Sequence, residues 1–169
     1  MSAIHIQYYQ HPYAEFILGS YQHQLCLCDF RYRKLRDTVD NRIKQGLNAE
    51  FIEQTDEVLE TTKQQLSEYF QGERNAFDLP LLTVGTPFQK SVWQALQTIP
   101  YGHTTAYGDL AKQLGQPTAF RAVANANGAN AHAIIIPCHR VIASNGGLGG
   151  YGGGVPLKQK LLALETRLI

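Results

Sequence analysis

IPCHRV, residues 136–141, is the stretch around which this sequence is organised. An apolar run over residues 133–136 leads into it, and Pro137 ends that run at a turn. A cysteine and a histidine then stand side by side, and a loop rich in glycine, residues 145–154, follows them. β-Branched residues, a proline, one reactive side chain and then flexible backbone are typical of a rigid platform that presents a nucleophile to a pocket. We therefore interpret Cys138 as that nucleophile.

The bulk properties of the chain indicate an ordinary globular protein. Its 169 residues suffice for one domain or two small ones, and 44% of them are hydrophobic. No run of 18 apolar residues occurs, and no basic start precedes an apolar core, so we expect neither a membrane span nor a signal peptide. Three cysteines do not fit an even disulfide framework. A reducing, intracellular setting is the natural expectation.

The two halves of the chain differ in charge. Residues 1–84 carry 8 basic and 12 acidic side chains, a net charge of −4, whereas residues 85–169 carry 7 basic and 2 acidic side chains, a net charge of +5. The half that contains the cysteine is therefore the half that suits an anionic partner. A chance imbalance on a solvated surface is the alternative, and charge alone does not decide between the two.

The first part of the chain predicts a small sheet followed by a helix. Alternation of apolar and polar residues indicates strands over residues 4–8 and 25–30, and Gly19-Ser20 gives a turn signal between them. Residues 34–47 are polar and predict no regular element, whereas the spacing over residues 49–70 predicts a helix. Gly72 fits the C-terminal cap of this helix. We expect an N-terminal α/β domain over residues 1–75 and a linker over residues 76–85.

Two further cysteines lie in the second predicted strand. Cys26 and Cys28 would share one face of it, since side chains alternate along a strand. They could form half of a metal site, but no second ligand pair lies nearby, and a structural zinc needs four ligands. We interpret them as small core residues.

The second half of the chain predicts mainly helices. TPFQ, residues 86–89, is a capping box with proline at the first helical position, and this helix ends near residues 100–102. Two short helices over residues 105–114 and 119–128, joined by a turn that contains Gly115, form a helix-turn-helix pattern. A last helix is expected from residue 156 to residue 168, and its apolar face carries Leu157, Leu161, Leu164 and Leu168.

These elements predict an α+β protein. A small N-terminal sheet-plus-helix domain would precede a mainly helical domain over residues 86–169, and the second domain would contain both the helix-turn-helix and the candidate nucleophile.

The adjacent cysteine and histidine can support nucleophilic chemistry. A cysteine reacts as its thiolate, so its ordinary pKa of about 8.5 must be lowered by a base or a positive field. His139 is a candidate base, but neighbours on an extended segment point to opposite sides, so a direct contact is not assured, and a bridging water could relay the proton. A histidine base also needs an acceptor for its other nitrogen. Glu165 could turn inward to serve as that acceptor, or it could stay on the surface.

Other interpretations of the same pair stay open on the residues alone. A metal site could recruit His132, but no fourth ligand is evident. A cysteine hydrolase would need the same nucleophile and base, although the chain carries no hydrolase signature that we recognise. A cysteine beside a histidine can also be part of a packed core.

The predicted helix over residues 119–128 consists almost entirely of small residues, with Arg121 as its cation. A helix that reads base edges in the major groove carries several long polar side chains, which this helix lacks. Small side chains let a backbone approach a narrow minor groove, and Arg121 could enter a base stack, as enzymes that flip a base require. Simple helix packing through alanine and valine is the alternative.

Several motifs together resemble the O6-alkylguanine-DNA alkyltransferases, also called methylated-DNA–protein-cysteine methyltransferases. The central match is PCHRV, residues 137–141. The other segments occur in family order and spacing across residues 85–166, whereas over residues 1–84 the resemblance is one of architecture. These segments are TPFQ at 86–89 with Val92-Trp93, IPYG at 99–102, Tyr107-Gly108, RAV at 121–123 and YGGG at 151–154.

The resemblance implies a DNA repair protein that works once per molecule. It would bind double-stranded DNA through the minor groove, flip the alkylated guanine out of the duplex, and transfer the O6-alkyl group irreversibly to Cys138. O4-alkylthymine is implied as a second substrate. No cofactor and no metal are implied. The protein would act as a monomer that can cluster on DNA, and it would be cytoplasmic with access to the chromosome.

The resemblance also implies a role for each matching residue. Cys138 would accept the alkyl group, His139 would act as the base through a water, Glu165 would be the acceptor for His139, and Asn130 would brace the active-site turn. Arg121 would fill the gap left by the flipped base. The implied guanine pocket comprises Tyr107, Val141, Tyr151, Gly152 and Gly153. The implied DNA-binding surface comprises Arg121, Ala122, Tyr107, Ala126 and Ala129.

The sequence departs from the family pattern at two positions, and two other classes of protein are to be weighed against the family. Ala129 and Ala131 stand where many relatives carry a basic residue and a proline, which would weaken phosphate contacts or loosen the turn. A non-catalytic lesion-binding module of the alkyltransferase-like kind lacks the cysteine, so the presence of Cys138 with His139 and Glu165 argues against that class. A cysteine hydrolase would differ by turning over many times.

Overall fold

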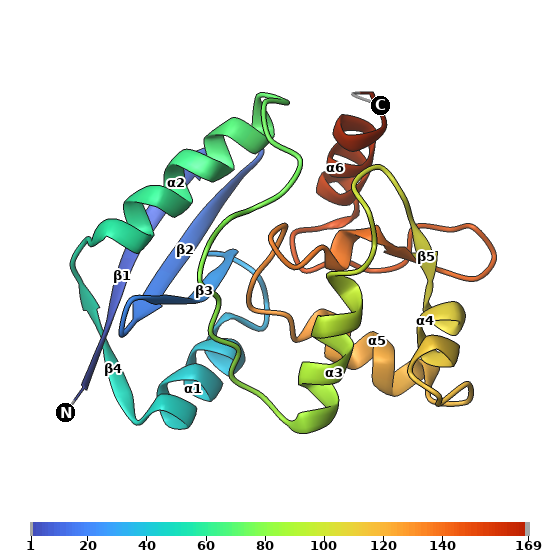
Figure 1. Ribbon diagram of the computed structural model, residues 1–169, viewed down its shortest axis with the longest axis horizontal. Coiled ribbons are helices and arrows are strands. Elements are labelled where there is room, and N and C mark those ends of the chain that lie inside the picture. The colour runs from blue at the N-terminus through green and yellow to red at the C-terminus, as the bar shows by residue number, and fades with distance from the viewer. Residues whose placement is uncertain (1, 168–169) are drawn as a thin grey trace. The chain divides into compact units, whose positions relative to one another are not determined.

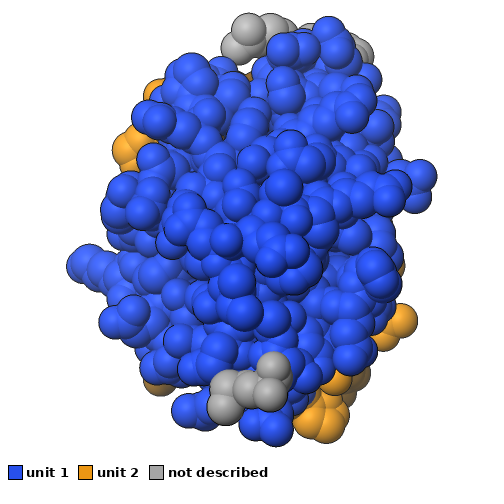
Figure 2. Space-filling model, turned by 90° about the vertical axis from the view of Figure 1, so that its left-hand side faces the viewer, with its two compact units in different colours: residues 1–85 blue, residues 86–169 orange. Residues whose placement is uncertain are grey.

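A computed structural model describes residues 2–167, and the chain divides into two compact units, Met1–Gly85 and Thr86–Ile169 (Figure 1; Figure 2 colours the two units). The first unit contains a four-stranded sheet with helices, and the second is mainly helical. The predicted α+β fold class is therefore confirmed. No helix within residues 2–167 is long and apolar enough to cross a membrane.

The sheet of the first unit has the strand order β3-β2-β1-β4. β1 (Ser2–His11) and β2 (Ala14–Tyr21) are antiparallel, as are β2 and β3 (Gln24–Phe30), whereas β4 (Ala49–Glu53) runs parallel to β1. Two-residue turns join the antiparallel strands, and Gln22 and His23 in the second turn have φ values of 49° and 66°. Such left-handed residues match the twist of a tight hairpin. The strands predicted over residues 4–8 and 25–30 are confirmed.

The turn predicted at Gly19-Ser20 is wrong. Both residues lie inside β2, where the pairing register with β3 shifts. A Cβ atom on Gly19 would lie 3.1 Å from the Cβ of Leu27, so a glycine is needed here for close strand packing rather than for chain reversal.

The segment before the long helix also differs from its prediction. Residues 34–47 contain α1 (Arg36–Leu47), and the first residues of the helix predicted over 49–70 form β4 instead. Val39 and Ile43 are the buried residues of α1, so its apolar stripe is weak. Asn48 closes α1 in the left-handed conformation with φ of 50°, which lets the chain turn directly into β4.

α2 (Glu57–Phe70) packs against β1, β2 and β3 (Figure 1). Asp56 caps its first turn by accepting a hydrogen bond from the Leu59 amide at 2.9 Å. The predicted cap at Gly72 is confirmed, since Gly72 has φ of 78° and the following amide bonds back to the Glu68 carbonyl at 2.8 Å.

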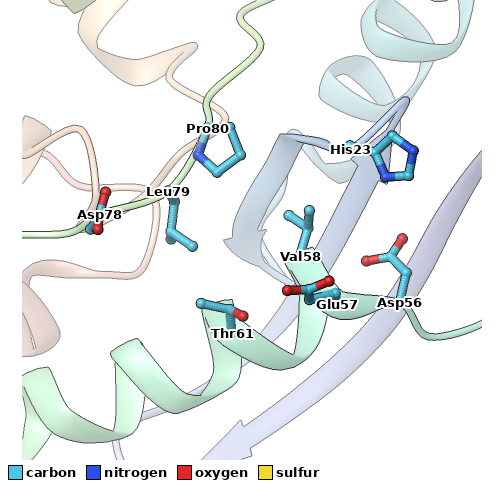
Figure 3. A pocket seen from close by; sticks show the side chains of 8 residues that line it. All are labelled: His23, Asp56, Glu57, Val58, Thr61, Asp78, Leu79 and Pro80. Atoms are coloured by element: carbon cyan, nitrogen blue, oxygen red, sulfur yellow. The ribbon is translucent and has the colours of Figure 1, made fainter.

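The segment predicted as a linker is hydrogen-bonded to the first unit. The Leu25 amide of β3 donates to the Pro80 carbonyl at 2.7 Å, and the Leu82 amide donates back to Leu25 at 2.9 Å. The Gln65 side chain of α2 bonds the backbone of Asp78 in both directions. The same unit contains a pocket of about 290 Å³ (Figure 3). It is lined by His23, Asp56, Glu57, Val58, Thr61, Asp78, Leu79 and Pro80, none of which was predicted as a site residue.

The second unit begins with α3 (Pro87–Leu96). Both hydrogen bonds of the predicted capping box are present, with Thr86 and Gln89 bonding each other's backbone amides. β5 (Thr105–Ala106) then pairs in parallel with β6 (Val141–Ile142), a pairing that local sequence patterns do not indicate. Because β5 directly precedes the helix-turn-helix and β6 begins at the last residue of the IPCHRV stretch, this pairing brings the two segments side by side.

The helix-turn-helix consists of α4 (Tyr107–Gln113) and α5 (Phe120–Gly128), which pack on each other. Gly115 ends α4 with φ of 73°. α6 (Val155–Arg167) closes the unit, with Leu157, Leu161 and Leu164 buried as predicted. Leu168, the last residue of the predicted apolar face, lies outside the described residues.

Gly46 offers a test of packing in the first unit. A Cβ atom there would lie 2.3 Å from Cγ1 of Val84, so Gly46→Ala should destabilise the fold by about 1–3 kcal/mol despite the better helix propensity of alanine. Gly128→Ala is the matched control, because nothing lies within 4 Å of its Cβ position. Thermal unfolding should show a lower Tm for Gly46→Ala alone, and an unchanged or higher Tm for this variant would contradict the predicted clash.

Candidate active site

A strained turn, residues 130–137, delivers the chain to Cys138. Ile134 has φ of 72°, which is a costly conformation for a β-branched residue. Asn130 holds the turn from within, because its Nδ2 donates to the Ile136 carbonyl at 2.8 Å and its Oδ1 accepts from the His132 amide at 3.0 Å. Strained backbone persists where its surroundings fix it, and it concentrates at functional sites. The structure thus places Asn130, the residue predicted as a brace, in hydrogen bonds with the turn that leads to Cys138.

Cys138 itself begins a short 3₁₀ helix, η1 (Cys138–Arg140). Its amide donates to the Ile136 carbonyl at 2.7 Å, and the residue is only 6% exposed. From the sequence, residues 138 and 139 were assumed to be extended, with side chains on opposite sides. That assumption is wrong, because a helical turn separates successive side chains by roughly a third of a revolution.

Glu165 of α6 lies between the two residues that follow the cysteine. Its Oε2 is 2.6 Å from His139 Nε2, while Arg140 Nε donates to Oε1 at 2.8 Å and Arg140 Nη2 donates to Oε2 at 3.2 Å. Arg140 also donates from Nη1 to the Ile99 carbonyl at 2.7 Å. His139 and Glu165 are both fully buried. The structure therefore resolves the choice for Glu165: the side chain faces inward.

The environment of His139 suits a neutral base. Burial lowers its pKa below the usual 6.5, and the neighbouring Glu165 opposes that shift only in part. Because Nε2 lies against the carboxylate, Nε2 carries the proton and Nδ1 carries the lone pair. Nδ1 is buried and has no hydrogen-bond partner among the described residues. It is the atom of His139 that can accept a proton.

Lys158 is a residue of the site that the sequence analysis missed. It is fully buried, and its ammonium donates to three carbonyls: Val141 at 2.6 Å, Leu148 at 2.5 Å and Gly150 at 3.3 Å. Burial lowers its pKa. The ammonium thereby fastens the glycine-rich loop to β6. The sequence does contain a signal for the burial of Lys158. Residues 158, 161 and 165 fall on one face of a helix, and Leu161 was already predicted to lie in the core.

Tyr107 starts α4 close to the cysteine. Burial raises the pKa of its hydroxyl, the nearby Cys138 raises it further, and a hydrogen bond with the Asn127 side chain opposes the shift. The ring also meets the glycine-rich loop, because a Cβ atom on Gly149 would lie 3.3 Å from Tyr107 Cε2. Asn127, which the sequence analysis also missed, donates from Nδ2 to the Cys138 carbonyl at 3.4 Å.

Of the remaining residues predicted for the guanine pocket, Val141 lies in β6 before this loop, and the other three lie within the loop. The Tyr151 ring approaches His139 edge-on, with 6.4 Å between ring centroids. Val141 is buried, and its carbonyl is the acceptor for Lys158. Gly152 is exposed and Gly153 is half-buried in the loop.

The residues predicted to bind DNA do not all lie on one surface. Arg121 and Ala122 are exposed in the first turn of α5. Ala129 is half-buried just after this helix. Ala126 is only 3% exposed, and its carbonyl accepts a hydrogen bond from Trp93 Nε1 at 2.8 Å. Its side chain packs inside the unit, so the exposed first turn of α5 is the part available to a ligand.

Metal-binding alternatives find no support in the described part of the chain. No group of three histidine, cysteine or carboxylate side chains within it could hold a metal ion. Cys26 and Cys28 are buried in β3, where burial raises the pKa of Cys26 to about 12 and raises that of Cys28 further. Both behave as core residues.

The fold and the site together define a class of protein. In this class, one unit contains a helix-turn-helix together with a buried cysteine, a neutral histidine and a buried carboxylate. Known families agree with this description. The model of the 6-O-methylguanine DNA methyltransferase DNA binding domain matches residues 87–167, and that of the ribonuclease-like domain of the same proteins matches residues 4–83.

Individual relatives extend the comparison. A methylated-DNA–protein-cysteine methyltransferase of Mycolicibacterium paratuberculosis is 58% identical over 104 residues, which cover 62% of this chain and 63% of the relative. One of Methanosarcina acetivorans is 52% identical over 112 residues, which cover 66% and 72%. The match thus spans somewhat less than two thirds of the first of these relatives.

Solved structures give a longer match. The O6-methylguanine methyltransferase of Mycobacterium tuberculosis has a TM-score of 0.82 and 37% identity, covering 98% of this chain and 94% of that chain. A Mycobacterium tuberculosis structure in complex with DNA gives a TM-score of 0.82 and 38% identity, covering 97% and 94%. The chain belongs to the O6-methylguanine-DNA methyltransferase family, whose function is DNA repair by alkyl transfer to a cysteine.

The buried ion pair between Arg140 and Glu165 gives a test of site stability. Arg140→Met leaves the carboxylate buried without its guanidinium, so it should cost about 3–5 kcal/mol of unfolding free energy. Adding Glu165→Gln should cost less than the sum of the two single changes, because the two groups are coupled. Lys90→Met, at an exposed position of α3, should change the same quantity by no more than about 0.5 kcal/mol. Urea unfolding measures the free energy of unfolding of each variant. A loss in Arg140→Met as small as the effect of Lys90→Met would contradict the predicted cost of leaving Glu165 unpaired.

Proposed function

We propose that this protein repairs O6-alkylguanine in double-stranded DNA by moving the alkyl group to Sγ of Cys138, once per molecule. One observation carries the proposal: a cysteine stands beside a buried histidine whose free nitrogen can take a proton and whose other nitrogen faces a buried carboxylate. The family relationship supports the same reaction.

The chemistry follows from the site. His139 Nδ1 takes the thiol proton through a bridging water, and Glu165 stabilises the imidazolium that forms. The thiolate attacks the alkyl carbon in line, the bond between that carbon and O6 breaks, and the electron pair stays on the purine. The purine, which stays in the DNA strand, takes up one proton, equivalent to the one that His139 removed, and is thereby restored to guanine. The product is a thioether, which no hydrolytic step reverses, so each molecule reacts once.

The surface around α5 supports DNA as the partner. A related Mycobacterium tuberculosis structure is a complex with DNA. Exposed Arg121 and Ala122 at the start of α5 combine one cation with a small side chain, which suits entry into a narrow minor groove. In this proposal Arg121 occupies the gap that the flipped base leaves, while Tyr107 and Tyr151 border the base. Monomeric action, clustering on DNA, activity on O4-alkylthymine and a cytoplasmic location stay predictions from the family resemblance.

A direct test uses intact protein mass. Wild-type protein mixed with excess duplex that contains one O6-methylguanine should gain a single methyl group in place of one hydrogen, and Cys138→Ala should gain none. Digestion should place the methyl group on the peptide that contains residue 138.

Other outcomes would replace the proposal. No mass change despite preferred binding to the lesion would indicate a sensing module. Continued release of product beyond one equivalent would indicate a hydrolase. Cys28→Ala, which removes a buried thiol of the first unit, is the matched control and should react like the wild type if it folds.

The pH dependence of the reaction tests the role of His139. Because its pKa lies below 6.5, the neutral base persists as pH falls through 6.5. The single-turnover rate of the wild type should therefore stay flat between pH 8 and 6.5 and decline only below that range. His139→Gln should be slower and should gain rate with rising pH through the ordinary thiol pKa of about 8.5. His103→Gln, at an exposed position, should keep the wild-type profile. A flat profile for His139→Gln would refute proton transfer through this residue.

A further inference from the structure

Phe120 is an exposed aromatic residue to which the proposed function gives no role. It is the first residue of α5 and is 50% exposed, whereas Val123 and Ala126 of the same helix are buried. A single exposed apolar side chain is common on a protein surface, so exposure alone indicates no partner. The place of Phe120 in the helix and the residues beside it are what make it informative.

The surroundings of Phe120 suit a polyanion. Arg121 follows it directly and is also exposed. Ala119, at the N-cap position of α5, has no polar side chain that could cap the first turn, and the N-terminus of a helix carries a partial positive charge that attracts phosphate groups. Residues 85–169 as a whole carry a net charge of +5. An aromatic ring among such charges fits nucleic acid better than it fits an apolar protein surface.

The geometry of a helix gives Phe120 and Arg121 different targets. Successive residues lie about 100° apart around the helix axis, so their side chains diverge. If Arg121 occupies the gap that the flipped base leaves, Phe120 meets the duplex beside that gap. Large apolar side chains in a minor groove insert between neighbouring base pairs and partly unstack them. Flipping a base requires the loss of its stacking, so a wedge at the neighbouring step lowers the cost of flipping.

We propose that Phe120 is a second wedge, whose ring enters the base step next to the gap that Arg121 fills. It is a positioning residue, because it opens the duplex and does not contact the reacting atoms. This inference rests on the proposed function, since it assigns a further element of the same DNA-binding surface.

The test compares two DNA substrates. Single-turnover methyl transfer is followed by intact mass, at saturating DNA, on a duplex with one O6-methylguanine and on the same strand without its complement. A single strand has no base pairs to open, so it does not need the wedge. Phe120→Ala should therefore lower the ratio of the duplex rate to the single-strand rate at least about fivefold, the effect of losing one stack between a base and an aromatic ring.

Two further variants at the same position separate the ring from other properties of the side chain. Phe120→Trp supplies a larger ring and should retain the ratio. Phe120→Gln fills space without a ring and should behave like Phe120→Ala.

Tyr32→Ala is the matched control. Tyr32 is an aromatic residue of the first unit and is 77% exposed, so its removal should leave both rates unchanged. Thermal unfolding shows whether each variant is folded. A structural role of Phe120 would slow both substrates by the same factor and leave their ratio at the wild-type value.

The salt dependence of duplex binding gives a second readout. Phe120→Ala removes no charge, so its affinity should fall with rising salt along the same slope as that of the wild type. A shallower slope would mean that phosphate contacts are lost, and it would contradict a wedge.

The outcomes separate this inference from the function beneath it. A ratio that changes less than about twofold in Phe120→Ala would overturn the wedge while leaving alkyl transfer intact. Self-association of the wild type that Phe120→Ala abolishes, with the ratio unchanged, would assign the ring to a second copy of the chain instead. Failure of the wild type to accept a methyl group from either substrate would overturn the proposed function itself.

Discussion

The active site depends on one carboxylate held in the interior of the second unit. Glu165 is fully buried, and burial of a charge is unfavourable unless it is paired and hydrogen-bonded. Arg140 supplies the compensating charge by bonding both oxygens, and one of them, Oε2, also orients His139. Because residues 139 and 140 belong to the same short helix as the cysteine, a single anion on α6 fixes both the His139 ring and the backbone that carries Cys138.

The rest of the site positions backbone rather than side chains. Asn130 secures the turn before the cysteine, and Lys158 secures the loop after it, each through bonds to carbonyl groups. A glycine-rich loop has many conformations available, so a buried ammonium that bonds two of its carbonyls, and a third carbonyl in β6, reduces them to a few. The same helix therefore carries a cation that orders the loop and an anion that orders the base, two turns apart.

The parts of this organisation that depend on interactions between residues close in sequence could be predicted from the sequence. The capping box at residues 86–89, the cap at Gly72 and the helix-turn-helix each depend on residues close together in the chain. α1 was missed because charge pairs such as Arg36 with Asp40, rather than an apolar stripe, accompany it. β4 was read as helix because its parallel partner lies more than 40 residues away. The residues alone indicated Cys138 as a nucleophile and His139 as a candidate base, whereas the role of Glu165 came from the family resemblance. Lys158 and Asn127 were missed because their partners are backbone carbonyls and a distant hydroxyl, although the helix face that carries Lys158 was a usable signal for its burial.

The contacts that make the site also join distant parts of the chain. Arg140 bonds Ile99 across 41 positions, His139 meets Glu165 across 26, and β5 pairs with β6. Contacts of such sequence separation form late in folding, because the loop between them must first be closed. A nascent or partly folded chain therefore carries at residue 138 a thiol with ordinary reactivity. In the proposed function, in which each molecule reacts once, Cys138 would thus gain its reactive surroundings together with the fold that encloses it.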